Sequence, residues 1–315
     1  IPAGMMGRKT DTFEKFVKTG DAEWPLLLPM VKSAVRAMDA VQEVCRHEWD
    51  IDVPAFTATG ASKRGWTTWL TGAVDKRATA IAPMVIDTLN MRPQMEHQLD
   101  AWGAFSEQIH DYTERGLQKA LATDAGNSLR DIVDPYSYRQ ALEQPKLIMI
   151  GTNDRYWPLD ALNLYWQDLI GEKYILYLPN NRHGLRDFPR MIGTLRALHQ
   201  EAKGESHLPH LSWKFVPGDT SVSLRVETDR KPRKVQVWLA TSKTRDFRDA
   251  HWSPQPTEKE GDAHVYDMVR PASGYSAMFG EAIYENDSFP FFLSTNVRIV
   301  ASDKRADRAG EGKSL

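Results

Sequence analysis

The sequence has a single cysteine, Cys45, in a chain of 315 residues. No disulfide can therefore form within the chain, and Cys45 lies in a helical pattern that predicts a small buried apolar residue. No apolar run reaches the roughly 18–20 residues that a membrane-spanning helix needs, so no membrane span is predicted. The 40 Lys and Arg residues are balanced by 42 Asp and Glu residues, so no basic surface for nucleic acid is predicted.

Other signals are also missing from the sequence. No group of His, Cys or acidic residues has the spacing of a metal site, and we expect neither a metal nor another cofactor. There is no internal repeat, and residues 1–6 carry no signal-peptide pattern. The length allows one large globular domain or two ordinary ones.

The most informative segment is an apolar strand, predicted over residues 53–59, that stops at Gly60 and turns into a helix after Ser62. A serine on such a turn has an exposed hydroxyl, and the N–H groups that follow face the group it attacks. The segment departs from the G-x-S-x-G pattern because Arg64 replaces the second glycine, which comes one residue later. Two interpretations stay open at this point: Ser62 is a nucleophile, or it caps the helix.

Two later strands end in loops that carry an acid and a histidine. The predicted strand 146–151 leads to Asp154, and the predicted strand 174–178 leads to His183. The chain order Ser62, Asp154, His183 is that of triads on the α/β-hydrolase fold. Each residue also follows the carboxyl end of a strand, where open α/β sheets place their sites. We therefore predict a nucleophilic serine, a histidine base and an aspartate that orients the imidazole.

Two further assignments complete the predicted chemistry. The backbone N–H of Lys63 is the expected donor to the oxyanion. Asp87, after the predicted strand 78–86, is the rival acid. Asp154 is preferred because its strand directly precedes the one that leads to His183.

Three aromatic residues are candidate substrate contacts. Tyr156 and Trp157 directly follow the predicted acid, and Trp66 lies on the helix after the nucleophile. For Trp66 the alternative is core packing, which its place on that helix favours.

Alternating strands and helices predict a mostly parallel sheet over residues 1–204. Residues 88–142 show no clear strand and are expected to form a helical lid over the site. About seven short alternating strands over 205–302 predict an immunoglobulin- or fibronectin-like sandwich. The charged tail, residues 303–315, is predicted to be disordered. The four main helices are predicted over about 24–49, 63–74, 159–170 and 188–202.

The C-terminal region contains several tryptophans. Trp213, Trp238 and Trp252 are expected in the core of the sandwich or between domains, rather than on a sugar-binding platform.

Several longer motifs are distinctive, and they comprise residues 16–30, 60–67, 73–77, 134–139, 171–173, 245–248 and 271–277. In these motifs the chain resembles the PhoPQ-activated pathogenicity-related protein family of α/β-hydrolases, over about residues 9–301. The resemblance implies an exported protein. Together with the predicted triad it leads us to expect a serine esterase that forms an acyl-enzyme with a small-molecule or glycan-linked ester.

Only one predicted helix and a short polar segment precede Val53, whereas an α/β-hydrolase has several strands before its nucleophile strand. We therefore expect an N-terminal segment or a second polypeptide to complete the sheet and to supply the second oxyanion donor. The alternative function is a catalytically weak or inactive hydrolase-like protein that signals or binds through its lid and sandwich.

Overall fold

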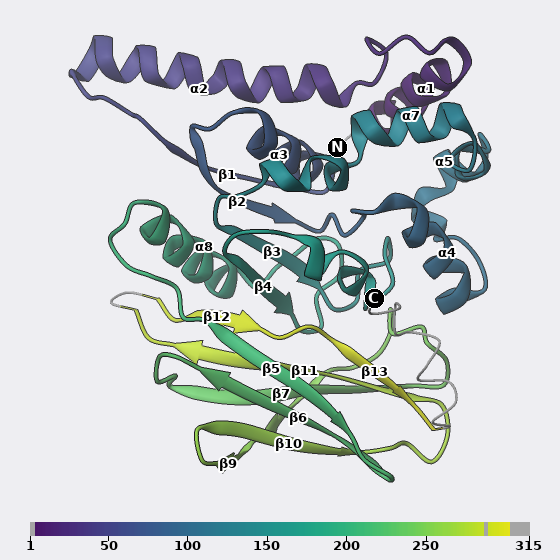
Figure 1. Ribbon diagram of the computed structural model, residues 1–315, viewed down its shortest axis with the longest axis vertical. Coiled ribbons are helices and arrows are strands. Elements are labelled where there is room, and N and C mark those ends of the chain that lie inside the picture. The colour runs from purple at the N-terminus through teal and green to yellow at the C-terminus, as the bar shows by residue number, and fades with distance from the viewer. Residues whose placement is uncertain (1–3, 287–288, 303–315) are drawn as a thin grey trace. The chain divides into compact units, whose positions relative to one another are not determined.

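The computed structural model describes residues 4–286 and 289–302, and the chain packs into two compact units (Figure 1). The first unit contains the chain up to Lys146 together with Tyr165–Lys173. The second contains Leu147–Leu164 and the chain from Tyr174 onward. The tail predicted to be disordered, residues 303–315, lies outside the described residues. The domain boundary predicted at residue 204 stays a prediction that residues 205–302 fold independently.

The first unit is built around two parallel strands, β1 (Phe56–Ala61) and β2 (Ala78–Met84), joined by helix α3 (Lys63–Val74). The register starts with a bulge between the first two residues of β1, which begins three residues later than predicted. Helix α3 packs on both strands and buries the side chains of Trp69 and Leu70. This local β–α–β arrangement positions the turn at Ser62.

Two helices precede these strands, and the first of them was not predicted. Helix α1 (Gly4–Thr19) buries Phe13 and Phe16, an apolar pair three residues apart on one helix face. Helix α2 (Leu27–Trp49) packs against α3 (Figure 1). The prediction for Cys45 on α2 was wrong, because its side chain is only half-buried.

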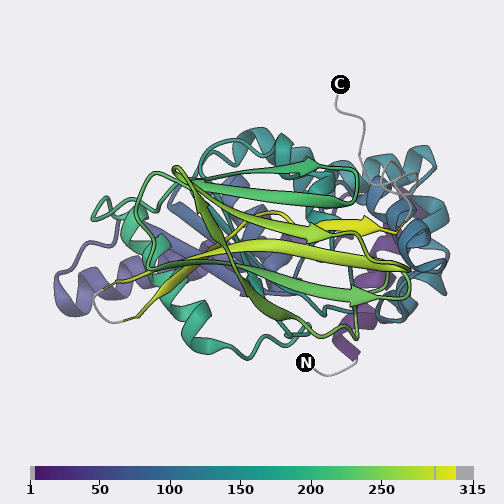
Figure 2. The same cartoon turned by 90° about the horizontal axis from the view of Figure 1, so that it is seen from below.

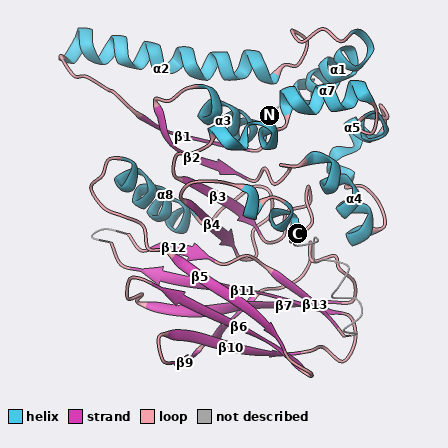
Figure 3. Cartoon of the chain, viewed as in Figure 1, coloured by secondary structure: helices cyan, strands magenta, loops and turns pink. Residues whose placement is uncertain are grey.

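Residues 88–142 form short helices (cyan in Figure 3). Within the first unit, three of them contact α1, and η2 packs on α3. Their role as a lid stays a prediction. The helices are α4 (Met91–Trp102), η1 (Glu107–Ile109), α5 (His110–Thr113), α6 (Leu117–Ala120), α7 (Asp124–Val133) and η2 (Pro135–Ala141).

The aspartate of the Asp-Pro-Tyr motif organises this helical region. The buried carboxylate of Asp134 accepts hydrogen bonds from the backbone N–H groups of Asn90, Met91 and Tyr136. It therefore caps η2 and the start of α4 at once. Burial nevertheless raises the pKa of Asp134 to about 6, against the effect of these donors.

The α-helix predicted over 159–170 is wrong. The chain forms two short 3-10 helices there, η3 (Ala161–Leu164) and η4 (Trp166–Asp168). The Nζ of Lys173 binds the carbonyl oxygens of Trp166 and Leu169, each at 2.7 Å. These two carbonyl groups therefore accept hydrogen bonds from a lysine side chain rather than from backbone N–H groups of an α-helix.

The second unit begins with the neighbouring strands β3 (Lys146–Gly151) and β4 (Lys173–Leu178). After β4 comes α8 (Phe188–Ala202), which Asp187 caps by accepting a hydrogen bond from the backbone N–H of Arg190. The predicted strand 146–151 and helix 188–202 match the structure in both bounds. The loops after β3 and β4 carry Asp154 and His183.

The rest of the second unit consists of two antiparallel sheets, with strand orders β5-β6-β10-β9 and β12-β11-β7-β8, where β13 also pairs with β11. Figure 2 shows these strands from below. The two sheets face each other at Gly280, where an added Cβ would lie 2.9 Å from Cγ2 of Val226. The described residues between 205 and 302 therefore form nine strands where about seven were predicted, and the immunoglobulin-like topology stays a prediction. The strands are β5 (Leu211–Pro217), β6 (Ser221–Thr228), β7 (Lys234–Ser242), β8 (Ser253–Pro256), β9 (Glu258–Glu260), β10 (Ala263–Val269), β11 (Tyr275–Tyr284), β12 (Phe291–Ser294) and β13 (Arg298–Ala301).

Trp252 lies in the core of the second unit, with 1% of its surface exposed. Its ring packs 5.3 Å from that of Phe279. Trp238 is half-buried and donates a hydrogen bond to the buried carboxylate of Glu281. Both positions agree with packing roles. In the part of the chain that the structure describes, no helix is both long enough and apolar enough to cross a bilayer.

Candidate active site

Ser62 occupies the turn between β1 and α3 in a conformation that side-chain-bearing residues seldom adopt. Its φ and ψ angles are 56° and −123°, which places strain at this position. Its backbone N–H donates to the carbonyl oxygen of Met84 at 2.8 Å. Although Ser62 is at the N-cap position of α3, its side chain makes no capping hydrogen bond. The hydroxyl is therefore not used as a helix cap.

The glycines on either side of Ser62 allow the strand and the helix to approach closely. An added Cβ at Gly60 would lie 2.9 Å from backbone atoms of Arg64. An added Cβ at Gly65 would lie 2.8 Å from both the carbonyl oxygen of Met84 and a methyl carbon of Ile86. Both distances are too short for any side chain. Gly65, which stands one residue later than the second glycine of the G-x-S-x-G pattern, thus allows α3 to pack closely against the end of β2 and the residues that follow it.

Lys63 is the first residue of α3, at the positive end of the helix dipole. Burial lowers the pKa of its ammonium group, and the nearby positive charge of Arg64 lowers it further. The backbone of Lys63 directly follows the serine, as expected of an oxyanion donor.

Asp154 and His183 form a hydrogen-bonded pair within the second unit. Nδ1 of His183 lies 2.9 Å from Oδ2 and 3.1 Å from Oδ1 of Asp154. The carboxylate is buried and also accepts a hydrogen bond from the backbone N–H of Tyr156 at 2.9 Å. Nε2 of His183 is buried and has no hydrogen-bond partner among the described residues of its own unit. The ring is thus held at one nitrogen and available at the other.

Of the two aromatic residues after Asp154, Tyr156 packs against this pair. The ring of Tyr156 packs on the imidazole of His183, with centroids 4.1 Å apart and planes inclined by 33°. Trp157 is buried, and its indole Nε1 has no hydrogen-bond partner among the described residues of its unit. The tyrosine ring restrains the imidazole, and the indole N–H is a free donor in that unit.

Two other predicted residues have structural partners in the first unit. Trp66 is 5% exposed, donates from Nε1 to the carbonyl oxygen of Val133 at 2.6 Å and meets Phe13 edge to face. These contacts support the core alternative over a substrate contact. The rival acid, Asp87, is buried and accepts a hydrogen bond from the hydroxyl of Tyr165 at 2.7 Å.

The predicted site residues thus form two groups. The first unit contains the strained turn with Ser62, Lys63 and Trp66. The second brings together Asp154, Tyr156 and His183, and it also contains Trp157.

Sequence reasoning missed Asn153 and Asn180, which connect the acid and histidine loops to a loop of the antiparallel sheets. Part of that loop, residues 247 and 248, belongs to the family-like motif 245–248, but nothing in the sequence linked this motif to Asn153 or Asn180. In the described ranges, no group of three His, Cys, Asp or Glu side chains is arranged to hold a metal ion.

Comparisons with known proteins match the sequence of this chain to a family. The sequence profile of the PhoPQ-activated pathogenicity-related protein family matches residues 10–248. Autocrine proliferation repressor protein A of Dictyostelium discoideum is 32% identical over 320 residues, which cover 92% of this chain. The chain spans 65% of the length of that relative.

Solved structures with partial similarity include hydrolases. An acetyl xylan esterase from Paenibacillus sp. R4 has a TM-score of 0.39 at 15% identity, covering 57% of this chain and 52% of the esterase. An acylaminoacyl peptidase from Pyrococcus horikoshii has a TM-score of 0.35 at 19% identity, covering 47% of this chain and 23% of the peptidase. At these TM-scores the likeness assigns no activity.

Proposed function

The chain belongs to the PhoPQ-activated pathogenicity-related protein family, and from this premise we propose that it is a serine hydrolase that acts on carboxylic esters. The observation that carries the proposal is the pair formed by Asp154 and His183, in which the carboxylate holds Nδ1 and Nε2 has no partner in its unit. This is the arrangement that a general base requires. The strained turn at Ser62, whose hydroxyl caps no helix, supports a nucleophile there.

In the proposed reaction, the hydroxyl oxygen of Ser62 attacks the ester carbonyl carbon while Nε2 of His183 takes the hydroxyl proton. Asp154 stabilises the imidazolium that forms. The backbone N–H of Lys63 donates to the oxyanion of the tetrahedral intermediate. The imidazolium then gives its proton to the departing alkoxide, which leaves an acyl-enzyme. Water, deprotonated by the same imidazole, then attacks the acyl carbon. The bond between that carbon and the Ser62 oxygen breaks, the imidazolium returns its proton to the serine oxygen, and the acid is released.

The proposed substrate is a small-molecule or glycan-linked ester. Trp157 supports this proposal because its indole N–H has no hydrogen-bond partner among the described residues of its unit, and such a donor can orient a polar group of a substrate. We also propose that this protein is exported. Residues 88–142 are proposed to form a lid over the site that selects substrates.

A panel of p-nitrophenyl esters tests the proposal. The wild-type chain and the variants Ser62→Ala and Ser33→Ala are compared at equal concentrations of folded protein. Ser33 is a matched control, because it lies on α2 and its hydroxyl donates to the carbonyl oxygen of Pro29 within that helix. We expect the first variant to lose at least about 10³-fold in kcat and the second to keep wild-type activity. Equal hydrolysis by all three proteins would contradict the proposal.

The name of the Dictyostelium relative supports a second candidate function. That protein is called an autocrine proliferation repressor, which describes a signal. We propose as the alternative that this chain signals or binds through the helices of residues 88–142 and the antiparallel sheets, with little or no catalysis. Repression of cell proliferation by the added protein, undiminished in Ser62→Ala, would favour this alternative.

A further inference from the structure

The loop between β7 and β8 reaches back to the segment that carries Asp154. We call residues 245–252 the clasp loop. The side-chain amide of Asn153 donates to three carbonyl oxygens in this loop: those of Ala250 at 2.7 Å, and of Phe247 and Arg248 at 3.3 Å each. Asn153 is 6% exposed. Losing these acceptors would leave a buried amide unpaired, which is costly.

The clasp loop also holds the segment that leads to His183. Asn180 pairs with the backbone of Trp252, donating from Nδ2 to its carbonyl oxygen at 2.9 Å and accepting from its N–H at 2.8 Å. Asn180 has a φ of 58°, a conformation that asparagine tolerates better than most residues. The ring of Trp252 is buried against Phe279. The pair thus ties the turn after β4 to the core of the antiparallel sheets.

Thr152 closes the network between the two segments. Its hydroxyl donates to Oδ1 of Asn153 at 2.8 Å and accepts from the backbone N–H of Asn180 at 2.9 Å. The backbone N–H of Asn153 in turn donates to the carbonyl oxygen of Asn181 at 2.9 Å. The acid segment, the histidine segment and the clasp loop are therefore joined in one ring of hydrogen bonds.

Exposed ionic contacts also reach the clasp loop. Asp249 pairs with Arg155 at 2.5 Å and lies 3.6 Å from Arg182, but Asp249 and Arg182 are well exposed, so these pairs contribute little.

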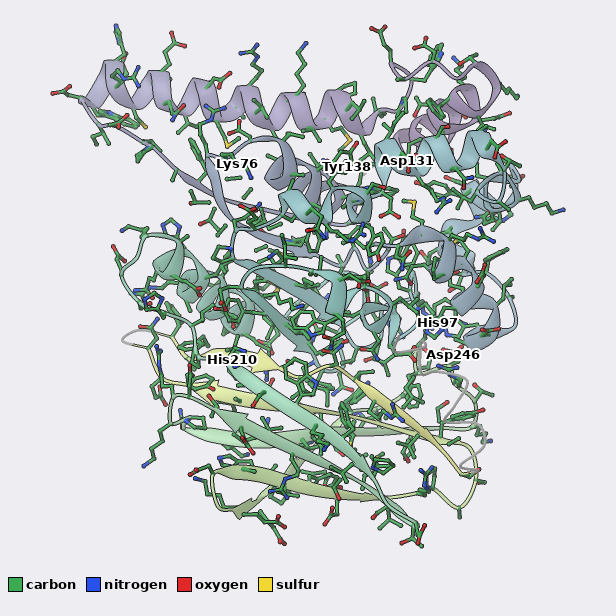
Figure 4. The ribbon with its side chains drawn as sticks, viewed as in Figure 1. Lys76, His97, Asp131, Tyr138, His210 and Asp246 are labelled. Carbon is green, nitrogen blue, oxygen red and sulfur yellow. The ribbon has the colours of Figure 1, made fainter. Side chains whose placement is uncertain are left out.

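Two further ion pairs hold the clasp loop. Inside the loop, Arg248 makes a bidentate contact with Asp246, which is labelled in Figure 4. Arg245 pairs with Asp160 at 2.8 Å, and both side chains are largely buried. The clasp loop is therefore held by a largely buried ion pair as well as by the two asparagines.

We propose that the clasp loop positions the acid and the base, with Asn153 and Asn180 as positioning residues. This inference rests on the proposed function. Asp154 directly follows Asn153, and His183 lies three residues after Asn180. Without the clasp, two loops at strand ends would have to hold a contact of 2.9 Å against their own conformational freedom. The antiparallel sheets then form part of the catalytic scaffold, because a precise geometry depends on the shell that supports it.

Proton NMR of the whole chain tests this proposal without measuring activity. The Nδ1 proton of His183, held by Asp154, should give a low-field resonance that exchanges slowly with water. Asn153→Ala should abolish that resonance or make its exchange fast. The control is Asn163→Ala, because Asn163 also donates from Nδ2 to a backbone carbonyl of the second unit, that of Val297 at 3.1 Å, and its side chain accepts from Asn296 rather than from either segment. Asn163 is exposed, so this control should keep the resonance with little change in melting temperature.

Asn180→Gly is a second variant, for use if Asn153→Ala does not fold, since glycine accepts the positive φ angle. It should also weaken protection of the Nδ1 proton. Wild-type exchange in the folded Asn153 or Asn180 variant, or no protected proton in the wild type, would overturn the proposal.

Labelling by a fluorophosphonate provides the link to catalysis. The rate at Ser62 should fall by about 10²-fold in Asn153→Ala and stay unchanged in Asn163→Ala. If the wild type is never labelled while protection of the Nδ1 proton still depends on Asn153, the proposed serine hydrolase function is wrong. The proposed positioning role of Asn153 is then still supported.

Discussion

At the scale of single residues, Ser62 has a strained backbone conformation that lowers the stability of the chain. A φ of 56° with a ψ of −123° suits glycine and opposes any residue with a Cβ. The serine side chain at this position therefore costs folding stability. The sequence predicted the turn and its serine. It gave no sign of the missing cap bond, which depends on the three-dimensional position of the hydroxyl.

Replacing Ser62 by glycine should stabilise the chain. We expect Ser62→Gly to raise the free energy of unfolding by about 1 kcal/mol, because glycine relieves the strain. Ser62→Ala keeps the Cβ and should leave it within about 0.5 kcal/mol of the wild type. Urea denaturation of the three proteins makes the comparison. A glycine variant less stable than the alanine variant would contradict the strain.

Asp134 should make stability depend on pH. Its pKa is raised to about 6 in the folded chain and is about 3.9 in an unfolded one, so the folded state binds more protons between these values. Stability should therefore fall as the pH rises from 4 to 6, by about 3 kcal/mol at most. Asp134→Asn cannot ionise and should lose this component.

Thermal melts of the wild type and of Asp134→Asn at pH 4, 5, 6 and 7 measure this effect. The difference between the two profiles isolates Asp134 from the other titrating groups. A difference that stays constant across this range would show that burial does not raise the pKa of this carboxyl.

At the scale of elements, sequence patterns correctly predicted the helices whose ends are set by neighbouring residues in the sequence. The helices 63–74 and 188–202 begin after a turn residue and a capping aspartate, and both are as predicted. The segment predicted as a helix over 159–170 forms two short 3-10 helices instead. Lys173, at the start of β4, binds the carbonyl oxygens of Trp166 and Leu169, a contact with another element that leaves no periodic signal in the segment itself.

The packing of α3 depends on Gly65. Alanine is favoured over glycine in a helix by up to about 1 kcal/mol, but a Cβ here would lie 2.8 Å from Met84 and Ile86. We expect Gly65→Ala to lower the free energy of unfolding by about 1–3 kcal/mol. Gly184→Ala, with nothing within 4 Å of the added Cβ, is the control and should be near neutral. Stabilisation by Gly65→Ala in urea denaturation would contradict the close packing.

At the scale of the whole molecule, chain order predicted the two strand-end loops that carry Asp154 and His183. It could not predict the clasp loop, because Asn153 and Ala250 are 97 residues apart in the sequence. Their contact depends on how β7 and β8 are placed in the antiparallel sheets. Hydrogen bonds between loops follow no periodicity, so only the folded chain reveals them.

The central claim is that Ser62 is a nucleophile activated by His183. The most direct measurement is the rate of fluorophosphonate labelling, with the modified residue identified by mass spectrometry of tryptic peptides. We predict a single adduct on Ser62 in the wild type, none on that peptide in Ser62→Ala, and a rate at least about 10³-fold lower in folded His183→Ala. A folded wild-type chain that takes no label at Ser62, or labels equally fast without His183, would contradict the account.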